Sequence, residues 1–104
     1  MRLSFTRMDV TSSRSGTSAT IVVIGDVDSD TAPALDGAVR ALIADGVTSL
    51  SLDATGISFL SSAGLSVFVG AKKELPDGFA LLRGNRTVDR LIELTGLELL
   101  YGTD

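Results

Sequence analysis

Segments with strand-like and helix-like apolar patterns alternate along this chain of 104 residues, and that alternation limits its fold more than any other feature. The run Ile21–Ile24 is β-branched and apolar at every position, as in a strand at the centre of a covered sheet. Apolar residues then recur at helical spacing on one face, at Leu35, Ala38, Val39, Leu42 and Ile43. Strands that alternate with helices pair in parallel through right-handed crossovers. We therefore predict an α/β domain with a mixed β-sheet and helices packed on it.

The same patterns predict where each element lies. We expect strands over Leu3–Val10, Ala19–Gly25, Ser49–Asp53 and Phe79–Leu82. We expect helices from the Asp30, Thr31 and Pro33 turn to Asp45-Gly46, over Ser62–Leu75, and over Thr87–Thr95 before a capping Gly96. Thr11–Ser18 is predicted to be an exposed connection between two antiparallel strands. The predicted order is β-β-α-β-α-β-α, and the pattern leaves open a short final strand over Leu97–Tyr101.

Composition limits the chemistry that this chain can perform. It contains no Cys, His or Trp, so a thiolate nucleophile, the commonest general base and the commonest metal ligand are absent. The formal net charge is −4, which disfavours nucleic acid as a partner. No apolar run reaches membrane-spanning length. We expect one domain over residues 1–104, cytoplasmic, without a cofactor or a metal, that binds another protein and is not an enzyme.

An acidic segment follows the second predicted strand. Asp26-Val27-Asp28-Ser29-Asp30 has the spacing of a calcium loop, but Thr31 stands where that loop needs Gly and Gly37 where it needs Glu. The better interpretation is a solvated acidic turn that caps the following helix. Its aspartates are nevertheless candidates for contacts with a partner, because loops on a rigid scaffold often carry binding.

A serine-rich segment, Ser61-Ser62-Ala63-Gly64-Leu65-Ser66, precedes the predicted second helix. In the simplest interpretation, one serine caps the helix, and the small residues let the helix approach the sheet closely. A phosphorylation site is also physically credible. A phosphoserine adds about −1.5 to −2 charges, which the free N–H groups at a helix N-terminus tolerate. The modification would then change the surface and leave the fold intact.

Three motifs, in order, resemble those of STAS domains. Ile24-Gly25-Asp26-Val27-Asp28, followed by Thr31-Ala32-Pro33, resembles the family's "G-E-L-D…T-A" signature. The segment from Leu52 to Leu65 resembles its "L-D-L-S-x-V-x-F-I-D-S-S-G-L" motif, and Leu91–Leu97 resembles its C-terminal helix ending. The resemblance runs from about Thr20 to Tyr101. For a domain of this length, it points to the bacterial anti-sigma factor antagonists.

That resemblance implies a regulatory switch. The unmodified antagonist binds an anti-sigma factor that is also a serine kinase, and a sigma factor is thereby released. The kinase then phosphorylates the antagonist, which dissociates, and a serine phosphatase resets it. The family's phosphoacceptor falls on Ser62, with Ser61 as the alternative. The partner-binding positions that the resemblance implies are Asp26, Asp28, Ser29, Thr31, Ser61, Ala63, Gly64 and Ser66.

One departure from the family pattern keeps a second function open. Ser61 stands where the family usually has Asp, directly before the phosphoacceptor position Ser62. Other members of the family are not phosphorylated and serve as binding subunits of an ABC-transporter ATPase or of a signalling scaffold. In that alternative Ser62 is not modified and serves only as a helix cap.

Overall fold

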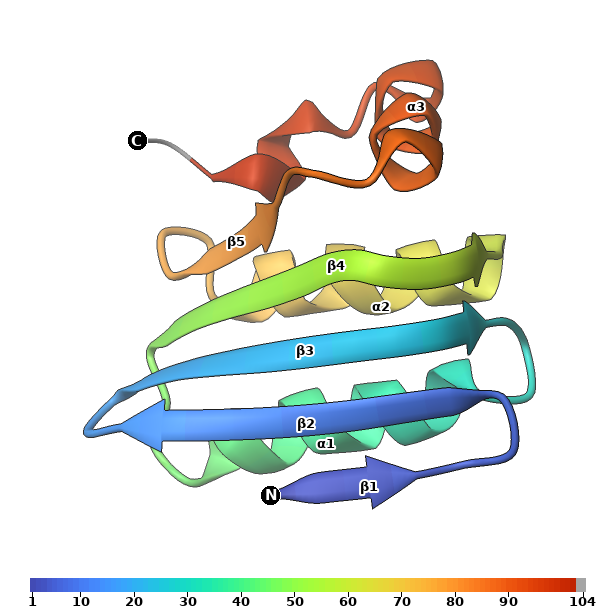
Figure 1. The fold of residues 1–104 in the computed structure, drawn as a ribbon. Helices are drawn as coiled ribbons and strands as arrows, with labels where there is room; N and C mark the ends of the chain where they lie inside the picture. Colours follow the sequence, from blue (N-terminus) through green and yellow to red (C-terminus); the bar gives the residue numbers. More distant parts are fainter. Residues whose placement is uncertain (103–104) are drawn as a thin grey trace.

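A five-stranded mixed sheet forms the centre of the computed structural model, which describes residues 1–102 (Figure 1). Its strands are β1 (Arg2–Ser4), β2 (Met8–Ser15), β3 (Ser18–Val27), β4 (Ser49–Leu60) and β5 (Phe79–Leu82). They lie side by side in chain order. The pairs β1–β2 and β2–β3 are antiparallel, whereas β3–β4 and β4–β5 are parallel. The predicted mixed α/β sheet is confirmed.

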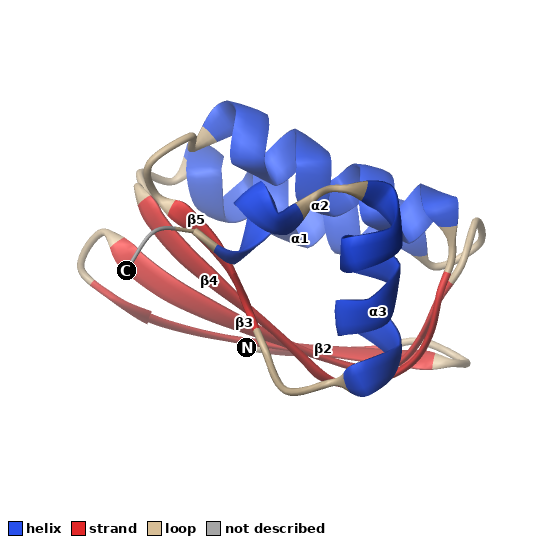
Figure 2. Cartoon of the chain, turned by 90° about the horizontal axis from the view of Figure 1, so that it is seen from above, coloured by secondary structure: helices blue, strands red, loops and turns tan. Residues whose placement is uncertain are grey.

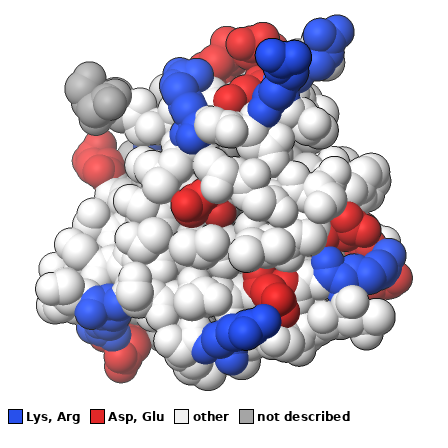
Figure 3. All heavy atoms as spheres, in the orientation of Figure 1, with Lys and Arg blue, Asp and Glu red and all other residues white. Residues whose placement is uncertain are grey.

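Two helices cover one face of the sheet. α1 (Ala32–Ala44) and α2 (Ser62–Glu74) pack side by side on that face, and α3 (Arg86–Thr95) stands at the β5 side (Figure 2). Between helices and sheet lies one apolar core, which includes the fully buried Ile21, Leu50, Leu52, Phe68 and Ile92. Charged side chains lie mainly around the margin of the opposite face of the sheet (Figure 3). Among residues 1–102, no helix is long and apolar enough to cross a membrane.

The N-terminal part of the fold differs from the prediction. Leu3–Val10 is not one strand, because the chain turns between Ser4 and Met8 and forms the separate strands β1 and β2. The prediction of Thr11–Ser18 as a connection was also wrong. β2 continues to Ser15 and pairs with β3 as far as Ser18, so only two residues remain in the turn. A run of small hydroxyl residues reads as a loop, yet it suits a strand whose outer face is exposed to water.

Two further boundaries differ. β4 does not end at Asp53 but continues to Leu60, with register shifts against β3 that signal bulges. These irregularities break the apolar alternation that would otherwise have marked the strand. The final strand over Leu97–Tyr101 is not formed, since the chain makes the 3₁₀ helix η1 (Glu98–Tyr101) there. Phe79–Leu82 is a strand as predicted, and Gly96 caps α3 with a φ of 71°.

Candidate functional site

The acidic and the serine-rich segments meet at one edge of the sheet. β3 and β4 are parallel, so their carboxyl ends lie together, and Val27 is paired with Leu60 in the last register position. The backbone N–H of Ser61 donates to the carbonyl of Val27 over 2.9 Å. We call Asp28–Thr31 together with Ser61 and Ser62 the loop pair. Ligand sites of α/β proteins commonly form at this edge of a parallel sheet.

Asp28 organises the first half of the loop pair. Its Oδ1 accepts hydrogen bonds from the backbone N–H groups of Asp30, at 2.9 Å, and Thr31, at 3.0 Å. Its carbonyl accepts from Ala32, so the chain enters α1 directly from this turn. The sequence suggested that Asp30 or Thr31 would cap α1. The side chain that caps this turn is Asp28, because Thr31 makes no side-chain cap bond to the helix.

Thr31 has a different task, which its burial explains. It is only 7% exposed, and its hydroxyl donates to the carbonyl of Asp26 over 2.8 Å. The same oxygen accepts from the backbone N–H of Asp28 over 2.9 Å. The hydroxyl thus joins the end of β3 to the start of α1. This makes Thr31 an internal support of the loop, whereas the neighbouring Ser29 is exposed.

Arg7, which the sequence did not single out, binds the acidic turn from the β1–β2 connection. Its guanidinium forms ion pairs with Asp28 at 2.7 Å and with Asp30 at 3.2 Å. Partial burial alone would raise the pKa of Asp28. The hydrogen bonds from Thr31 and Asp30 and the charge of Arg7 outweigh that effect and hold the pKa below its ordinary value. Asp28 is therefore a fixed, ionised group with a side chain only 16% exposed.

Ser61 and Ser62 form the second half and have separate roles. Ser61 is the N-cap of α2, and its hydroxyl accepts from the backbone N–H of Gly64 at a long 3.3 Å. Ser62 is the first residue of the helix, and its side chain is exposed. Among the described residues its hydroxyl makes no side-chain hydrogen bond, while its carbonyl accepts from the Ser66 hydroxyl over 3.0 Å. An exposed hydroxyl at a helix N-terminus can carry a phosphoryl group without disturbing the core.

Gly64 fixes the position of α2 relative to the sheet. A Cβ atom there would lie 2.7 Å from a side-chain carbon of Val27 and 2.6 Å from one of Leu60. A larger residue would need these side chains to move, which confirms the expected role of a small residue at Gly64, whereas Ser66 is exposed. The hydrogen bond from the Ser61 N–H to the Val27 carbonyl holds the start of the helix, and with it Ser62, at the end of β3.

The structure brings the predicted partner-binding residues together around the loop pair. Ser61, Ala63, Gly64 and Ser66 lie in the first turns of α2, and Asp28, Ser29 and Thr31 form the adjoining turn. Asp26 is the partly buried strand residue just before that turn, opposite Phe59 of β4. From this placement we expect the exposed members of the set to contact a partner. The sequence offered no signal for Arg7, because its ion pairs join positions more than twenty residues apart.

Comparison with known proteins agrees with this architecture. Residues 10–101 match the family model described as "Mlab, STAS domain". An anti-sigma-B factor antagonist of Listeria monocytogenes is 37% identical over 81 residues, which cover 74% of this chain and 70% of that protein. The crystal structure of an anti-sigma factor antagonist from Mycobacterium paratuberculosis superposes with a TM-score of 0.80 and 30% identity, covering 88% of this chain and 80% of that one. The chain therefore belongs to the STAS domain family.

Its similarity within that family is to the anti-sigma factor antagonists. The phosphorylated form of the Bacillus protein SpoIIAA has the same fold, with a TM-score of 0.72 over 91% of this chain and 89% of that one. Its 19% identity supports the fold alone. The chain is thus a STAS domain with an acidic turn and an exposed serine at the carboxyl ends of the neighbouring strands β3 and β4.

Proposed function

We propose that this protein is a cytoplasmic anti-sigma factor antagonist that binds its anti-sigma factor through the loop pair and releases it when Ser62 is phosphorylated. Antagonism is supported by the relatives that share this fold and this sequence pattern. Of the predicted positions, Asp26, Asp28, Ser29, Ser61, Ala63 and Ser66 would form the contact surface. Thr31 and Gly64 are buried, so they would support that surface from inside. The partner would be a serine kinase, and a serine phosphatase would reverse the modification.

The observation that carries the switch is the exposed side chain of Ser62 at the first position of α2. Its modification needs no rearrangement, because the neighbouring N–H groups of the helix can receive phosphate oxygens. The added charge of about −1.5 to −2 would stand beside the acidic turn. A partner that fits closely against this edge would lose contact through bulk and through repulsion of its own acidic groups. The chain itself would be the substrate of the kinase and would perform no catalysis.

A pull-down with a matched set of variants tests this function. Wild type, Ser62→Asp and Ser62→Asn are immobilised in parallel, and the proteins that bind are identified by mass spectrometry. We expect a serine-kinase anti-sigma factor with wild type and Ser62→Asn and its loss with Ser62→Asp, since only the aspartate adds charge. Incubation of the recovered kinase with ATP should phosphorylate wild type but not Ser62→Ala. Equal recovery by Ser62→Asp, or equal phosphorylation of Ser62→Ala, would contradict the switch at Ser62.

Ser61 favours a second candidate function. A serine at this position removes the acidic neighbour that the family usually places before the phosphoacceptor, and the cap bond to Gly64 gives Ser61 a purely structural role. The protein would then be a binding subunit that is not phosphorylated, of an ABC-transporter ATPase or of a signalling scaffold. The same pull-down distinguishes the two. A transporter ATPase that binds all three proteins equally would favour this alternative.

A further inference from the structure

The edge of the sheet at β1 has unused backbone hydrogen-bonding groups. Met1 exchanges two backbone hydrogen bonds with Ser12, at 2.8 and 2.7 Å, and Phe5 donates to the carbonyl of Met8 over 2.8 Å. Backbone groups in an antiparallel pair alternate in direction along the strand. The N–H and C=O groups of Arg2 and Ser4 therefore point away from β2, toward the open side.

The opposite edge of the sheet is covered. β5 packs against η1, and an added Cβ at Gly102 would lie 3.1 Å from that of Ala80. Lys72 also donates to the carbonyl of Phe79 over 3.1 Å. β1 has no such cover among residues 1–102, since β2 is its one neighbour in the sheet. β1 is only three residues long and carries the charged Arg2, two features that weaken pairing at an edge, but it has no proline and no charged side chain on its core-facing side.

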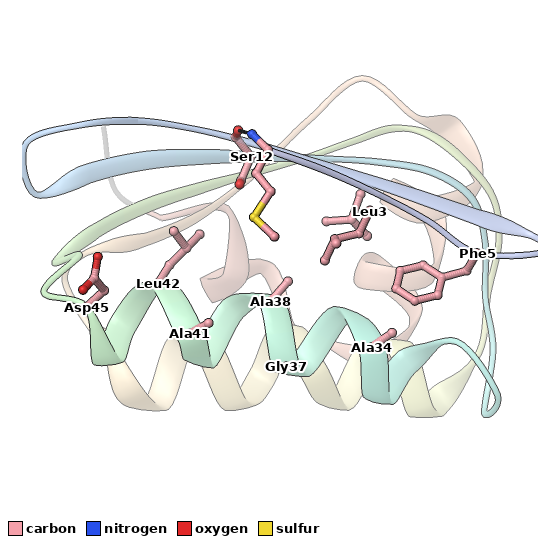
Figure 4. Close-up of a pocket in the computed structure, with 11 residues that line it drawn as sticks. Leu3, Phe5, Ser12, Ala34, Gly37, Ala38, Ala41, Leu42 and Asp45 are labelled. Carbon is pink, nitrogen blue, oxygen red and sulfur yellow. Dashed lines mark hydrogen bonds between the residues drawn. The ribbon is translucent and has the colours of Figure 1, made fainter.

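An apolar groove lies directly beside this open edge. It has a volume of about 550 Å³ and runs between β1 and α1 (Figure 4). Leu3 and Phe5 point from the strand side toward the helix, and α1 presents mainly short residues there, at Ala34, Gly37, Ala38 and Ala41, with Leu42 near its C-terminal end. At the rim, Met1 is 81% exposed and Phe5 40% exposed. Most of the large apolar side chains that line the groove therefore come from the strand side.

We propose that a second copy of this chain occupies the edge and closes the groove, with the two β1 strands paired antiparallel about Leu3. In this register, Leu3 faces Leu3 of the second copy, and Arg2 faces Ser4. Each pairing of Arg2 with Ser4 uses the outward N–H and C=O groups of both residues, so the free backbone groups of both strands are satisfied together. Met1 then lies opposite Phe5, where a thioether and a ring pack favourably.

The charges and apolar pattern of β1 fit this occupant. Met1-Arg2-Leu3-Ser4-Phe5 alternates apolar and polar residues, so the second strand presents its own apolar side chains to the α1 face of the sheet. Centring on Leu3 separates the two Arg2 side chains, each of which is already paired with Asp9 at 3.0 Å. The two-fold axis stands perpendicular to the sheet, which puts both α1 helices on the same face of the joined sheet, one on each side of the paired β1 strands. Ser62, on α2 beneath the other half of the sheet, stays accessible.

Sedimentation velocity with a matched pair of variants tests the dimer. So small an interface implies a weak dimer, and the measurement therefore covers about 10 µM to 1 mM. Ser4→Pro removes one outward N–H group, which edge strands tolerate, whereas Ser4→Ala keeps it. We expect wild type and Ser4→Ala to dimerise over this range and the dissociation constant of Ser4→Pro to rise at least about tenfold. A monomeric wild type at every concentration, or an equally dimeric Ser4→Pro, would overturn the proposal.

Single cysteines test the register without relying on that proline. The native chain contains no Cys, so each variant has one thiol. Residues that face each other outside the hydrogen-bonded pairs have Cα atoms about 4.5 Å apart, within disulfide range. On oxidation, we expect rapid cross-linking of Leu3→Cys and slow cross-linking of Ser4→Cys alone. A mixture of Arg2→Cys and Ser4→Cys places its thiols in a hydrogen-bonded pair with Cα atoms about 5.5 Å apart, so it should cross-link faster than Ser4→Cys alone. Faster cross-linking of Ser4→Cys alone than of Leu3→Cys would overturn the register.

Discussion

α2 and α3 each begin with an N-cap residue whose side chain accepts a backbone hydrogen bond, but the two caps make very different numbers of contacts. At the start of α2, the Ser61 side chain accepts one hydrogen bond, at 3.3 Å. At the start of α3, the Asn85 side chain accepts from the N–H groups of Thr87 and Val88 and also donates to three carbonyls of β4, those of Ala54, Thr55 and Ile57. One cap serves only its own helix, whereas the other also holds a bulged strand in place.

The two caps differ in what they do: the cap of α3 stabilises the fold, whereas the start of α2 leaves a side chain exposed. The carbonyls that Asn85 binds lie beyond Asp53, where the pairing of β4 with β5 has ended, so the amide binds backbone groups that have no strand partner on that side. The start of α2 carries no such duty, and its first residue is exposed. Under the proposed function, a phosphate on Ser62 would therefore leave the hydrogen bonds that begin α2 in place.

The largest effect that would test this contrast is that of Asn85→Ala. The substitution removes the cap of α3 and leaves three β4 carbonyls without their side-chain donor, which should lower the free energy of unfolding by about 3 kcal/mol. Urea denaturation measures it. Asn85→Asp is the control, since it keeps the cap acceptor but loses the amide donors, and it should remain clearly destabilised. A loss below about 1 kcal/mol for both variants would remove the distinction between the two caps.

A smaller loss is expected at the start of α1, from Thr31→Val. The methyl group keeps the shape but leaves the carbonyl of Asp26 and the N–H of Asp28 without the buried hydroxyl, which should cost about 2 kcal/mol. Thr31→Ser keeps that hydroxyl and should lose less. Thermal unfolding of the two variants side by side measures the difference. If the serine variant proved the less stable of the two, the hydroxyl would not be the stabilising group.

Ser61 should respond least among the caps. Ser61→Ala should lower the free energy of unfolding by about 0.5–1 kcal/mol, because the bond to Gly64 is long. Ser61→Asp should restore or exceed wild-type stability, since a carboxylate is favoured at a helix N-terminus. Urea denaturation of the two variants gives both values. A loss for Ser61→Ala as large as that for Asn85→Ala would show that the α2 start is not weakly fastened.

The smallest effect is a dependence of stability on acid at Asp28. Its pKa is lowered in the folded protein, so its contribution is fully present above the unfolded pKa of about 3.9 and is lost as the pH falls through the folded value. The melting temperature of wild type should therefore fall more steeply below about pH 4 than that of Asp28→Asn. At pH 7 the order of stability should favour wild type. Parallel curves for the two proteins would show that Asp28 contributes nothing through its charge.

Local patterns predicted the elements whose apolar period is regular. The strand over Phe79–Leu82 and the glycine cap of α3 follow from neighbouring residues and were confirmed. The prediction of a final strand over Leu97–Tyr101 was wrong because this segment is apolar without a regular period. Its 3₁₀ helix depends on packing against β5. The prediction of one strand over Leu3–Val10 was wrong because the turn between β1 and β2 interrupts a run of strand-forming residues, and nothing in that run indicates a reversal of the chain.

The site was predictable in part for the same reason. The acidic turn and the serine-rich segment are each one short continuous stretch of sequence. The strands that precede them pair in parallel, which brings the two segments together. Arg7 and Asn85 act across the fold, on residues that no local pattern connects with them. The cap of α1 was predicted at Asp30 or Thr31, and the role of Asp28 in the turn before the helix was missed, because it depends on where the backbone turns.

The double ion pair of Arg7 bears on how a partner approaches. Seen from solution, the single cation of Arg7 offsets one of the two carboxylate charges of Asp28 and Asp30, so this end of the sheet projects a weaker field than its aspartates suggest. The association rate with an anti-sigma factor should then depend less on ionic strength than two unpaired aspartates would predict. The lifetime of the complex, and not the speed of encounter, would be the quantity that a phosphate on Ser62 changes.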